Sequence, residues 1–448
     1  MTPYTLPQEG EGWYSVPMPI RLDARAADFS QEFRAFLDTK REASADVEQA
    51  VRAIIADVAA RGDAALIELT QKFDRVDPGK IGLRVTAAEL DAASAACDRE
   101  ALDALTLARD RIEIYHRRQL PKDDRWTDPL GVELGHRWTA IEAVGLYVPG
   151  GTAAYPSSVL MNAVPAKVAG CPRVVMVVPT PDGKLNPLVL AAAKLAGVDE
   201  IYRIGGAQAV AALAYGTATI APVAKIVGPG NAYVAAAKRL VFGRVGIDMI
   251  AGPSEVLIIA DRDANPEWIA ADLLAQAEHD TAAQAILITD DVALADAVER
   301  AVEGQLKTLP RGEVAGASWR DFGAIILVGK LDDAVALTDA IAPEHLEIET
   351  HDPEPLAAKI RNAGAIFLGS HTPEAIGDYV AGSNHVLPTA RSARFSSGLG
   401  VLDFMKRTSI LRLDAGALGK LGPAAIALGK AEGLDAHARS VAMRLNRR

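Results

Sequence analysis

The chain has 448 residues, half of them hydrophobic and 23% charged, so it is long enough for two or three globular domains. Its 58 acidic and 47 basic side chains give a formal net charge of −11, and no long basic run occurs. This balance argues against nucleic acid or an anionic membrane surface as a partner. No apolar run approaches the roughly 18 residues of a membrane span.

The chain has two cysteines, Cys97 and Cys171. This number excludes a disulfide framework and a cysteine-rich metal site. The first 19 residues lack the basic start and apolar run of a signal peptide. A reducing, cytoplasmic location is therefore expected.

Residues 1–21 are predicted to form an irregular arm. From Ala27 to about His116 the apolar residues recur with the 3.6-residue helical period, as at 46–55. The chain then alternates between short apolar strands and Ala-rich helices. The predicted strands are 144–148, 174–178, 200–204, 225–227, 255–260, 285–289, 324–328, 346–349 and 365–368.

Short apolar strands joined by helices are typical of parallel sheets with helices on both faces. Nine such strands are more than one sheet needs, and Gly/Pro-rich joints occur at 148–151 and 251–254. We therefore predict two doubly wound α/β domains, each an incomplete Rossmann-like fold, with one inserted in the other. The first comprises residues 22–146 and 256–380, and the second, nucleotide-binding, comprises residues 147–255.

The chain changes character after Asp378. Residues 381–410 are rich in Gly, Ser, Asn and Thr, and a helical segment follows from about Pro423 to Leu445. This segment has little local core of its own. Residues 381–448 are therefore predicted to form a tail that packs on another surface, such as a partner subunit.

Three glycine-containing loops leave predicted strands, at 145–151, 205–208 and 228–231. A helix N-terminus reached through glycines suits a phosphate group, and Asn231 can cap the helix that follows. The dinucleotide fingerprint is incomplete because Tyr233 occupies its third glycine position. The pattern alone leaves nucleotide binding and simple tight turns open.

Residues 272–280 are predicted to end a helix, and they include two possible metal ligands. Gln276 and His279 are three residues apart and lie on one helical face. An imidazole is a common zinc ligand and an amide oxygen a weaker one, so this pair holds at most part of a metal's shell. The alternative is a polar surface histidine.

Other ionisable residues follow further along the chain. Glu344 and His345 are adjacent at a helix-to-strand junction, where they make either an acid–base pair or a surface turn. Asp378 follows the last predicted strand, and His385 lies seven residues further on. Read without context, His437 in the tail is an exposed helical residue.

Taken together, nine ordered motifs resemble the histidinol dehydrogenase family from about residue 22 to the C-terminus. They are Gly-Leu-Tyr-Val-Pro-Gly-Gly at 145–151, Gly-Gly-Ala-Gln-Ala at 205–209, Gly-Pro-Gly-Asn-Ala at 228–232, Ala-Gly-Pro-Ser-Glu-Val at 251–256, Ala-Gln-Ala-Glu-His at 275–279, Pro-Glu-His-Leu at 343–346, Gly-Asp-Tyr at 377–379, Asn-His-Val-Leu-Pro-Thr at 384–389 and Glu-Gly-Leu-Asp-Ala-His at 432–437.

The resemblance implies a homodimer that oxidises L-histidinol to L-histidine through bound L-histidinaldehyde, in two NAD-dependent steps that end histidine biosynthesis. It implies one zinc ion per subunit, which orients the substrate. The tail would reach the active site of the other subunit. The implied zinc ligands are Gln276, His279, Asp378 and His437.

The resemblance also assigns the remaining site residues. His345 would be the general base and Glu344 would activate water, while His385 has a supporting role near Asp378. Tyr147, Gln208 and Asn231 would contact NAD. The implied substrate-binding residues are Ser254, Gln276, His279, His345, Asp378, Glu432 and His437.

Three other interpretations compete with this one. A related zinc- and NAD-dependent dehydrogenase would act on another small alcohol, such as a sulfonated diol, but the carboxylate of Glu432 favours a cationic or imidazole-bearing substrate. A regulatory nucleotide-binding protein would have a broken Glu–His pair or lack a metal ligand. A purely structural α/β protein leaves His279, Asp378 and His437 unexplained as a set.

Overall fold

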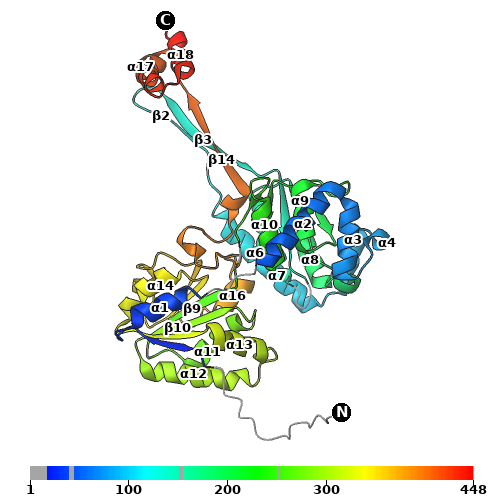
Figure 1. Ribbon diagram of the computed structural model, residues 1–448, viewed down its shortest axis with the longest axis vertical. Helices are drawn as coiled ribbons and strands as arrows, with labels where there is room; N and C mark the ends of the chain where they lie inside the picture. The colour runs from blue at the N-terminus through cyan, green and yellow to red at the C-terminus, as the bar shows by residue number, and fades with distance from the viewer. Residues whose placement is uncertain (1–17, 40–44, 151–154, 251, 447–448) are drawn as a thin grey trace, which may run out of the picture.

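The computed structural model describes residues 18–39, 45–150, 155–250 and 252–446, which form two α/β domains and a C-terminal extension (Figure 1). The first domain is built on a six-stranded parallel sheet with strand order β1-β11-β10-β9-β12-β13. Its strands are β1 (Ile20–Asp23), β9 (Glu255–Ala260), β10 (Gln284–Thr289), β11 (Ala324–Leu327), β12 (His345–Glu349) and β13 (Ala365–Leu368).

Helices cover both faces of the six-stranded sheet, because its central strands are apolar on both sides. Every residue of β9 and β10 is buried. Alternate side chains of β9 therefore enter two separate cores. The helices on one face are α11 (Pro266–Ala277), α12 (Val292–Leu306) and α13 (Gly312–Phe322), and those on the other are α1 (Phe29–Leu37), α14 (Ala334–Ile341) and α15 (Glu354–Ala357).

The second domain has a five-stranded parallel sheet with strand order β6-β5-β4-β7-β8. Its strands are β4 (Ala143–Tyr147), β5 (Arg173–Val177), β6 (Glu200–Tyr202), β7 (Lys225–Val227) and β8 (Gly246–Ile247). One face is covered by α5 (Ala87–Ala96), α6 (Arg99–Arg117), α7 (Pro156–Val168) and α8 (Pro187–Leu195), and the other by α2 (Ala45–Arg61), α3 (Asp63–Asp74), α9 (Gly206–Tyr215) and α10 (Ala232–Val241).

The predicted pair of α/β domains, one inserted in the other, is confirmed, but the predicted assignment of residues 22–146 to the first domain is wrong for most of that segment. Only β1 and α1 join the six-stranded sheet. The helices α2, α3, α5 and α6 pack on the five-stranded sheet, and β4 belongs to it. The apolar stripe of a helix shows that it is buried, but does not show against which sheet.

Five strands were absent from the sequence prediction, among them β8 at the edge of the five-stranded sheet. Residues 20 and 21, assigned to the irregular arm, begin strand β1, which pairs with β11; residues 1–17 of that arm lie outside the described part. An antiparallel three-stranded sheet joins the tail to the second domain. Its strands are β2 (Asp124–Thr127), β3 (Glu133–Ala140) and β14 (Met405–Arg412).

The C-terminal extension projects away from both domains (Figure 1). The antiparallel strands carry the two tail helices, α17 (Ala415–Ala431) and α18 (Asp435–Arg444), which pack mainly on each other. Several large apolar side chains of these helices and of the turn between them are exposed. They are Leu421, Leu428, Leu434 and Met443. Among the described residues, no helix is long and apolar enough to cross a membrane.

Candidate active site

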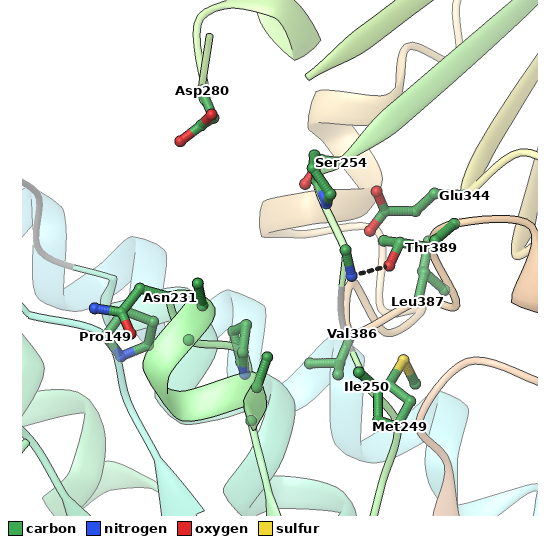
Figure 2. Close-up of a pocket in the computed structure, with 18 of the residues that line it drawn as sticks. Pro149, Asn231, Met249, Ile250, Ser254, Asp280, Glu344, Val386, Leu387 and Thr389 are labelled. Atoms are coloured by element: carbon green, nitrogen blue, oxygen red, sulfur yellow. Dashed lines mark hydrogen bonds between the residues drawn. The ribbon is translucent and has the colours of Figure 1, made fainter. Parts of the chain in front are cut away.

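A cavity of about 660 Å³ lies between the two domains. The second domain contributes the loops that follow β4 and β7, including Pro149 and Asn231, and the first contributes residues at the beginnings of β9 and β12, including Ser254 and Glu344. Figure 2 shows these two sets of side chains on opposite sides of the cavity. The cavity therefore brings together residues that lie far apart in the sequence.

The end of helix α11 supplies two of the predicted metal ligands. Asn265 caps its N-terminus by accepting the backbone N–H of Glu267 at 2.9 Å. Gln276, in the last turn, is fully buried, and neither its Oε1 nor its Nε2 has a hydrogen-bond partner among the described residues. His279 follows the helix rather than belonging to it, but it lines the same cavity.

Asp378 lies on the short helix α16 (Glu374–Tyr379) and also lines the cavity. An amide oxygen, an imidazole nitrogen and a carboxylate oxygen together make an N/O donor set that suits zinc. A buried amide without a partner is costly unless something binds it. Gln276, His279 and Asp378 therefore fit a zinc ion, with the amide of Gln276 as the most specific indication.

Glu344 and His345 are both almost completely buried in the cavity wall. The predicted surface turn is therefore excluded for this pair. Glu344 Oε2 accepts the backbone N–H of Glu255 at 3.0 Å, and His345 Nδ1 lies 3.0 Å from the carbonyl oxygen of Glu255. His345 Nε2 is 3.6 Å from Asp378 Oδ1. The strand β9 thus fixes both groups, and the Nε2 atom faces the predicted metal ligand.

A third carboxylate, that of Glu374 on α16, lies 3.5 Å from His345 Nδ1. Burial raises the pKa of Glu374 to about 8 and that of Glu344 to about 7. Burial by itself lowers the pKa of His345, but the surrounding carboxylates outweigh it and raise this pKa well above its ordinary value. Burial also acts against ionisation of Asp378, yet contact with His345 holds its pKa below the usual range. The carboxylates therefore favour a protonated His345 until another positive charge enters the site.

Two further histidines, His279 and His385, lie close enough to Asp378 to act on its charge. The ring of His279 is exposed within the cavity, but neighbouring protein atoms reduce its hydration and lower its pKa. His385 Nδ1 lies 3.1 Å from the backbone oxygen of Asp378, and its Nε2 lies 3.3 Å from Ser158 Oγ. Burial lowers its pKa as well. The structure thus places His385 against Asp378, as the sequence suggested.

The glycine loop after β7 is held by a buried ion pair that the sequence gave no reason to expect. Lys238 Nζ pairs with Asp248 and also donates to the carbonyl oxygen of Gly228 at 3.0 Å. Asp248 Oδ2 accepts the backbone N–H of Gly228 at 2.7 Å. Gly228 has φ +112°, and a Cβ there would lie 2.1 Å from the carbonyl oxygen of Tyr147, so only glycine fits.

The three residues predicted to contact NAD have different surroundings. Asn231 lines the cavity and caps α10, accepting the backbone N–H groups of Tyr233 at 3.1 Å and Val234 at 3.2 Å. Tyr147 and Gln208 are buried below the surface, and the Tyr147 hydroxyl accepts the backbone N–H of Gly206 at 3.0 Å. A helix N-terminus that opens into the cavity beside glycines fits the diphosphate of a dinucleotide.

The two tail residues assigned to the site do not reach it within one chain. Glu432 is the C-cap residue that follows α17, and His437 lies on α18; both are exposed and outside the described cavity lining. Figure 1 shows these helices at the far end of the extension. The described site therefore gathers three of the four predicted zinc ligands.

An interdomain cavity with a buried carboxylate–imidazole pair and an N/O metal-ligand set defines an α/β enzyme that performs acid–base chemistry on a small molecule. The family model of histidinol dehydrogenase matches residues 37–445. The chain belongs to the histidinol dehydrogenase family, whose members are oxidoreductases of histidine biosynthesis.

Individual relatives agree with this assignment. The chain is 76% identical over 429 residues to the histidinol dehydrogenase of Bradyrhizobium diazoefficiens, covering 96% of this chain and 100% of the relative. It is 78% identical over 429 residues to that of Nitrobacter winogradskyi, with the same coverage. The crystal structure of histidinol dehydrogenase from Elizabethkingia anophelis superposes with a TM-score of 0.91 at 36% identity, covering 96% of this chain and 98% of that one.

Proposed function

We propose that the protein oxidises L-histidinol to L-histidine through bound L-histidinaldehyde, in two successive hydride transfers to NAD at the interdomain cavity. The proposal rests above all on the buried Glu344–His345 pair, which lies beside Asp378 in the same cavity as Gln276 and His279. A purely structural protein would have no use for so many buried ionisable groups in one cavity, because each costs stability.

The proposed zinc ligands in one chain are Gln276, His279 and Asp378, and NAD binds at the loop that ends with Asn231. When bound, zinc supplies a positive charge that orients the substrate's amino and imidazole nitrogens and lowers the pKa of His345. When bound, NAD supplies the hydride acceptor. Ser254, on the wall opposite Asn231, contacts the substrate (Figure 2).

His345 Nε2 takes the hydroxyl proton of L-histidinol in the first oxidation. Its Nδ1 is held by the carbonyl oxygen of Glu255 at 3.0 Å, so in the neutral ring Nδ1 carries the proton and Nε2 is the base. Glu344 then takes a proton from the water that attacks the aldehyde carbon. Its pKa of about 7 places both of its protonation states within reach at neutral pH. His345 acts again on the hydrated aldehyde in the second oxidation.

We further propose that the active protein is a homodimer in which His437 completes the zinc shell of the other subunit and Glu432 contacts its substrate. Both residues are exposed at the end of a projecting extension, and the tail helices expose Leu428 and Met443, each 64% exposed. Apolar side chains displayed in this way are typical of a surface that packs on a partner. A cytoplasmic location stays a prediction.

The direct test is the yield of NADH per L-histidinol consumed, before and after chelation. A ratio of two that chelation abolishes and zinc restores would support the proposal. A zinc-loaded protein that forms no NADH from L-histidinol would contradict it, and activity on a sulfonated diol would assign the site to a different alcohol.

A further inference from the structure

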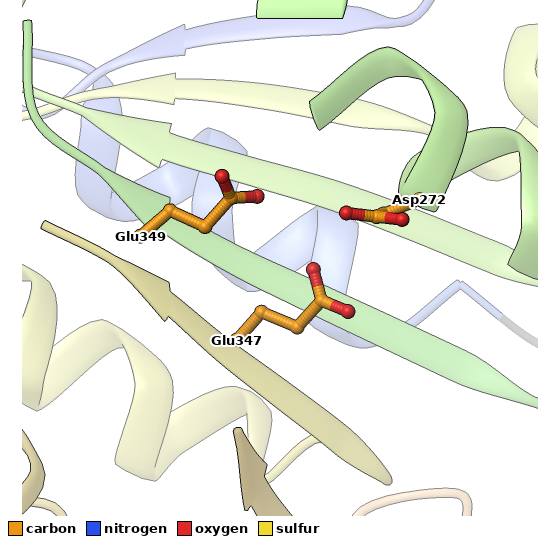
Figure 3. A group of neighbouring side chains, drawn as sticks. All are labelled: Asp272, Glu347 and Glu349. Carbon is orange, nitrogen blue, oxygen red and sulfur yellow. The ribbon is translucent and has the colours of Figure 1, made fainter. Parts of the chain in front are cut away.

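Three carboxylates meet between helix α11 and strand β12, the strand that begins with His345. Asp272 comes from α11, and Glu347 and Glu349 come from β12, where residues two apart share one face of the sheet. Figure 3 shows the three side chains converging. Each offers a carboxylate oxygen within 4.8 Å of the other two.

Glu349 is only 3% exposed, yet neither of its carboxylate oxygens has a hydrogen-bond partner among the described residues. Glu347 is 2% exposed; its Oε1 accepts the backbone N–H of Glu374 at 2.5 Å, while its Oε2 is likewise unpartnered. Asp272 is half-buried and forms the more open side of the group. Three unpartnered oxygens therefore point into one buried space.

Such a group is unstable if all its members are ionised without a counter-charge. Burial raises the pKa of Asp272 to about 6 and that of Glu349 to about 7. The charged groups that act on these carboxyls within the described chain are themselves acidic. The cluster therefore needs either bound protons or a cation from outside the chain.

We propose that Asp272, Glu347 and Glu349 form a second cation site, separate from the catalytic residues, that takes a hard divalent cation of the Ca²⁺ class. The ligands are all oxygen, which favours Ca²⁺, Mg²⁺ or Mn²⁺ over zinc. The spread of up to 4.8 Å between oxygens matches atoms on opposite sides of a Ca²⁺ ion, at the 2.3–2.6 Å of its bonds. Water can complete the shell on the side of Asp272.

This cation has a structural role. Helix α11 also carries Gln276, one turn after Asp272, and strand β12 begins with His345. A cation bound by both elements would tie the proposed zinc ligand to the catalytic base. It would also neutralise the charge that otherwise opposes this packing.

The test uses the full-length protein with zinc already bound, so that calcium does not compete for the imidazole-containing site. Equilibrium dialysis against Ca²⁺ at pH 8 is expected to give one bound Ca²⁺ per chain. Glu349→Gln should weaken this binding at least about tenfold, because an amide cannot supply a negative ligand. Glu354→Gln, an exposed glutamate outside the cluster, is the matched control and should bind as the unmodified protein does.

Thermal unfolding provides a second measurement. Saturating Ca²⁺ should raise the Tm of the unmodified protein and of Glu354→Gln by at least about 2 °C, and raise that of Glu349→Gln clearly less. Absence of Ca²⁺ binding to the unmodified protein at millimolar concentration would overturn the proposal and assign the cluster to shared protons or to a basic side chain of a second copy. Equal binding by Glu349→Gln would also overturn it.

Discussion

Substitution of Gln276 tests whether this buried amide is present in the cavity wall to bind zinc. Its amide is fully buried, and both polar atoms lack a hydrogen-bond partner among the described residues. An unsatisfied buried donor or acceptor costs about 1–3 kcal/mol, so the two atoms together cost about 4 kcal/mol. Reshaping the site around a leucine costs up to about 1.5 kcal/mol, which leaves a net gain of roughly 2 kcal/mol. Gln276→Leu should therefore stabilise the zinc-free protein by about 2 kcal/mol while weakening zinc binding.

The assay is urea unfolding of chelator-treated protein, together with zinc content after reloading. Gln284→Leu is the matched control, because Gln284 is also buried but its Nε2 donates to the carbonyl oxygen of Phe322 at 3.2 Å. That substitution should destabilise the protein by about 1 kcal/mol without changing zinc content. A Gln276→Leu protein that is less stable, or that still holds zinc with unchanged affinity, would refute the reasoning.

Three further predictions concern catalysis. His345→Ala should abolish turnover and leave zinc content intact, as metal analysis would show; loss of zinc would mean that His345 is a ligand. When the aldehyde is supplied, its oxidation should speed up as the pH rises through about 7, because the ionised form of Glu344 is the base that activates water. Glu344→Gln should lose this part of the rise and keep only the part that comes from His345. An unchanged pH profile would rule out that role. Gly228→Ala should raise the KM for NAD at least about tenfold, because the added Cβ would lie 2.1 Å from a carbonyl oxygen. Gly304→Ala is the control and should leave the KM unchanged, because the space around Gly304 is open. Equal KM values for the two variants would show that the loop does not bind NAD.

Much of the fold was predictable because its strands are short, apolar and buried on both faces. Each of the nine predicted strands corresponds to a strand in one of the two parallel sheets. The strands that were missed lie at edges or in the projecting sheet, where burial is partial and the apolar signal weak. In strand β3, for example, all residues but one are half-buried, and β2 is exposed throughout. Assignment of the helices between residues 45 and 117 failed because helical periodicity does not identify the packing partner.

The candidate site was partly predictable for a similar reason. Glu344 and His345 could be identified from the sequence as candidate site residues, because they are chemically distinctive and lie in a short motif. The structure places them in one cavity with Asp378. Glu374 and the Lys238–Asp248 pair were missed, because acids and lysines are common on helices and only three-dimensional packing shows that these are buried. Spacing along the chain cannot show a contact made across two domains.

The proposed activity depends on a site assembled from two copies of the chain, and a mixture of inactive variants tests this most directly. His345→Ala and His437→Ala damage different parts of the site, and unfolding and refolding them together would form hybrid dimers. If His437 acts in the other subunit, half of the dimers are hybrids, and each regains one of its two sites. The mixture should then oxidise L-histidinol at about a quarter of the unmodified rate. A mixture as inactive as its components, although hybrids are detected, would contradict the shared site.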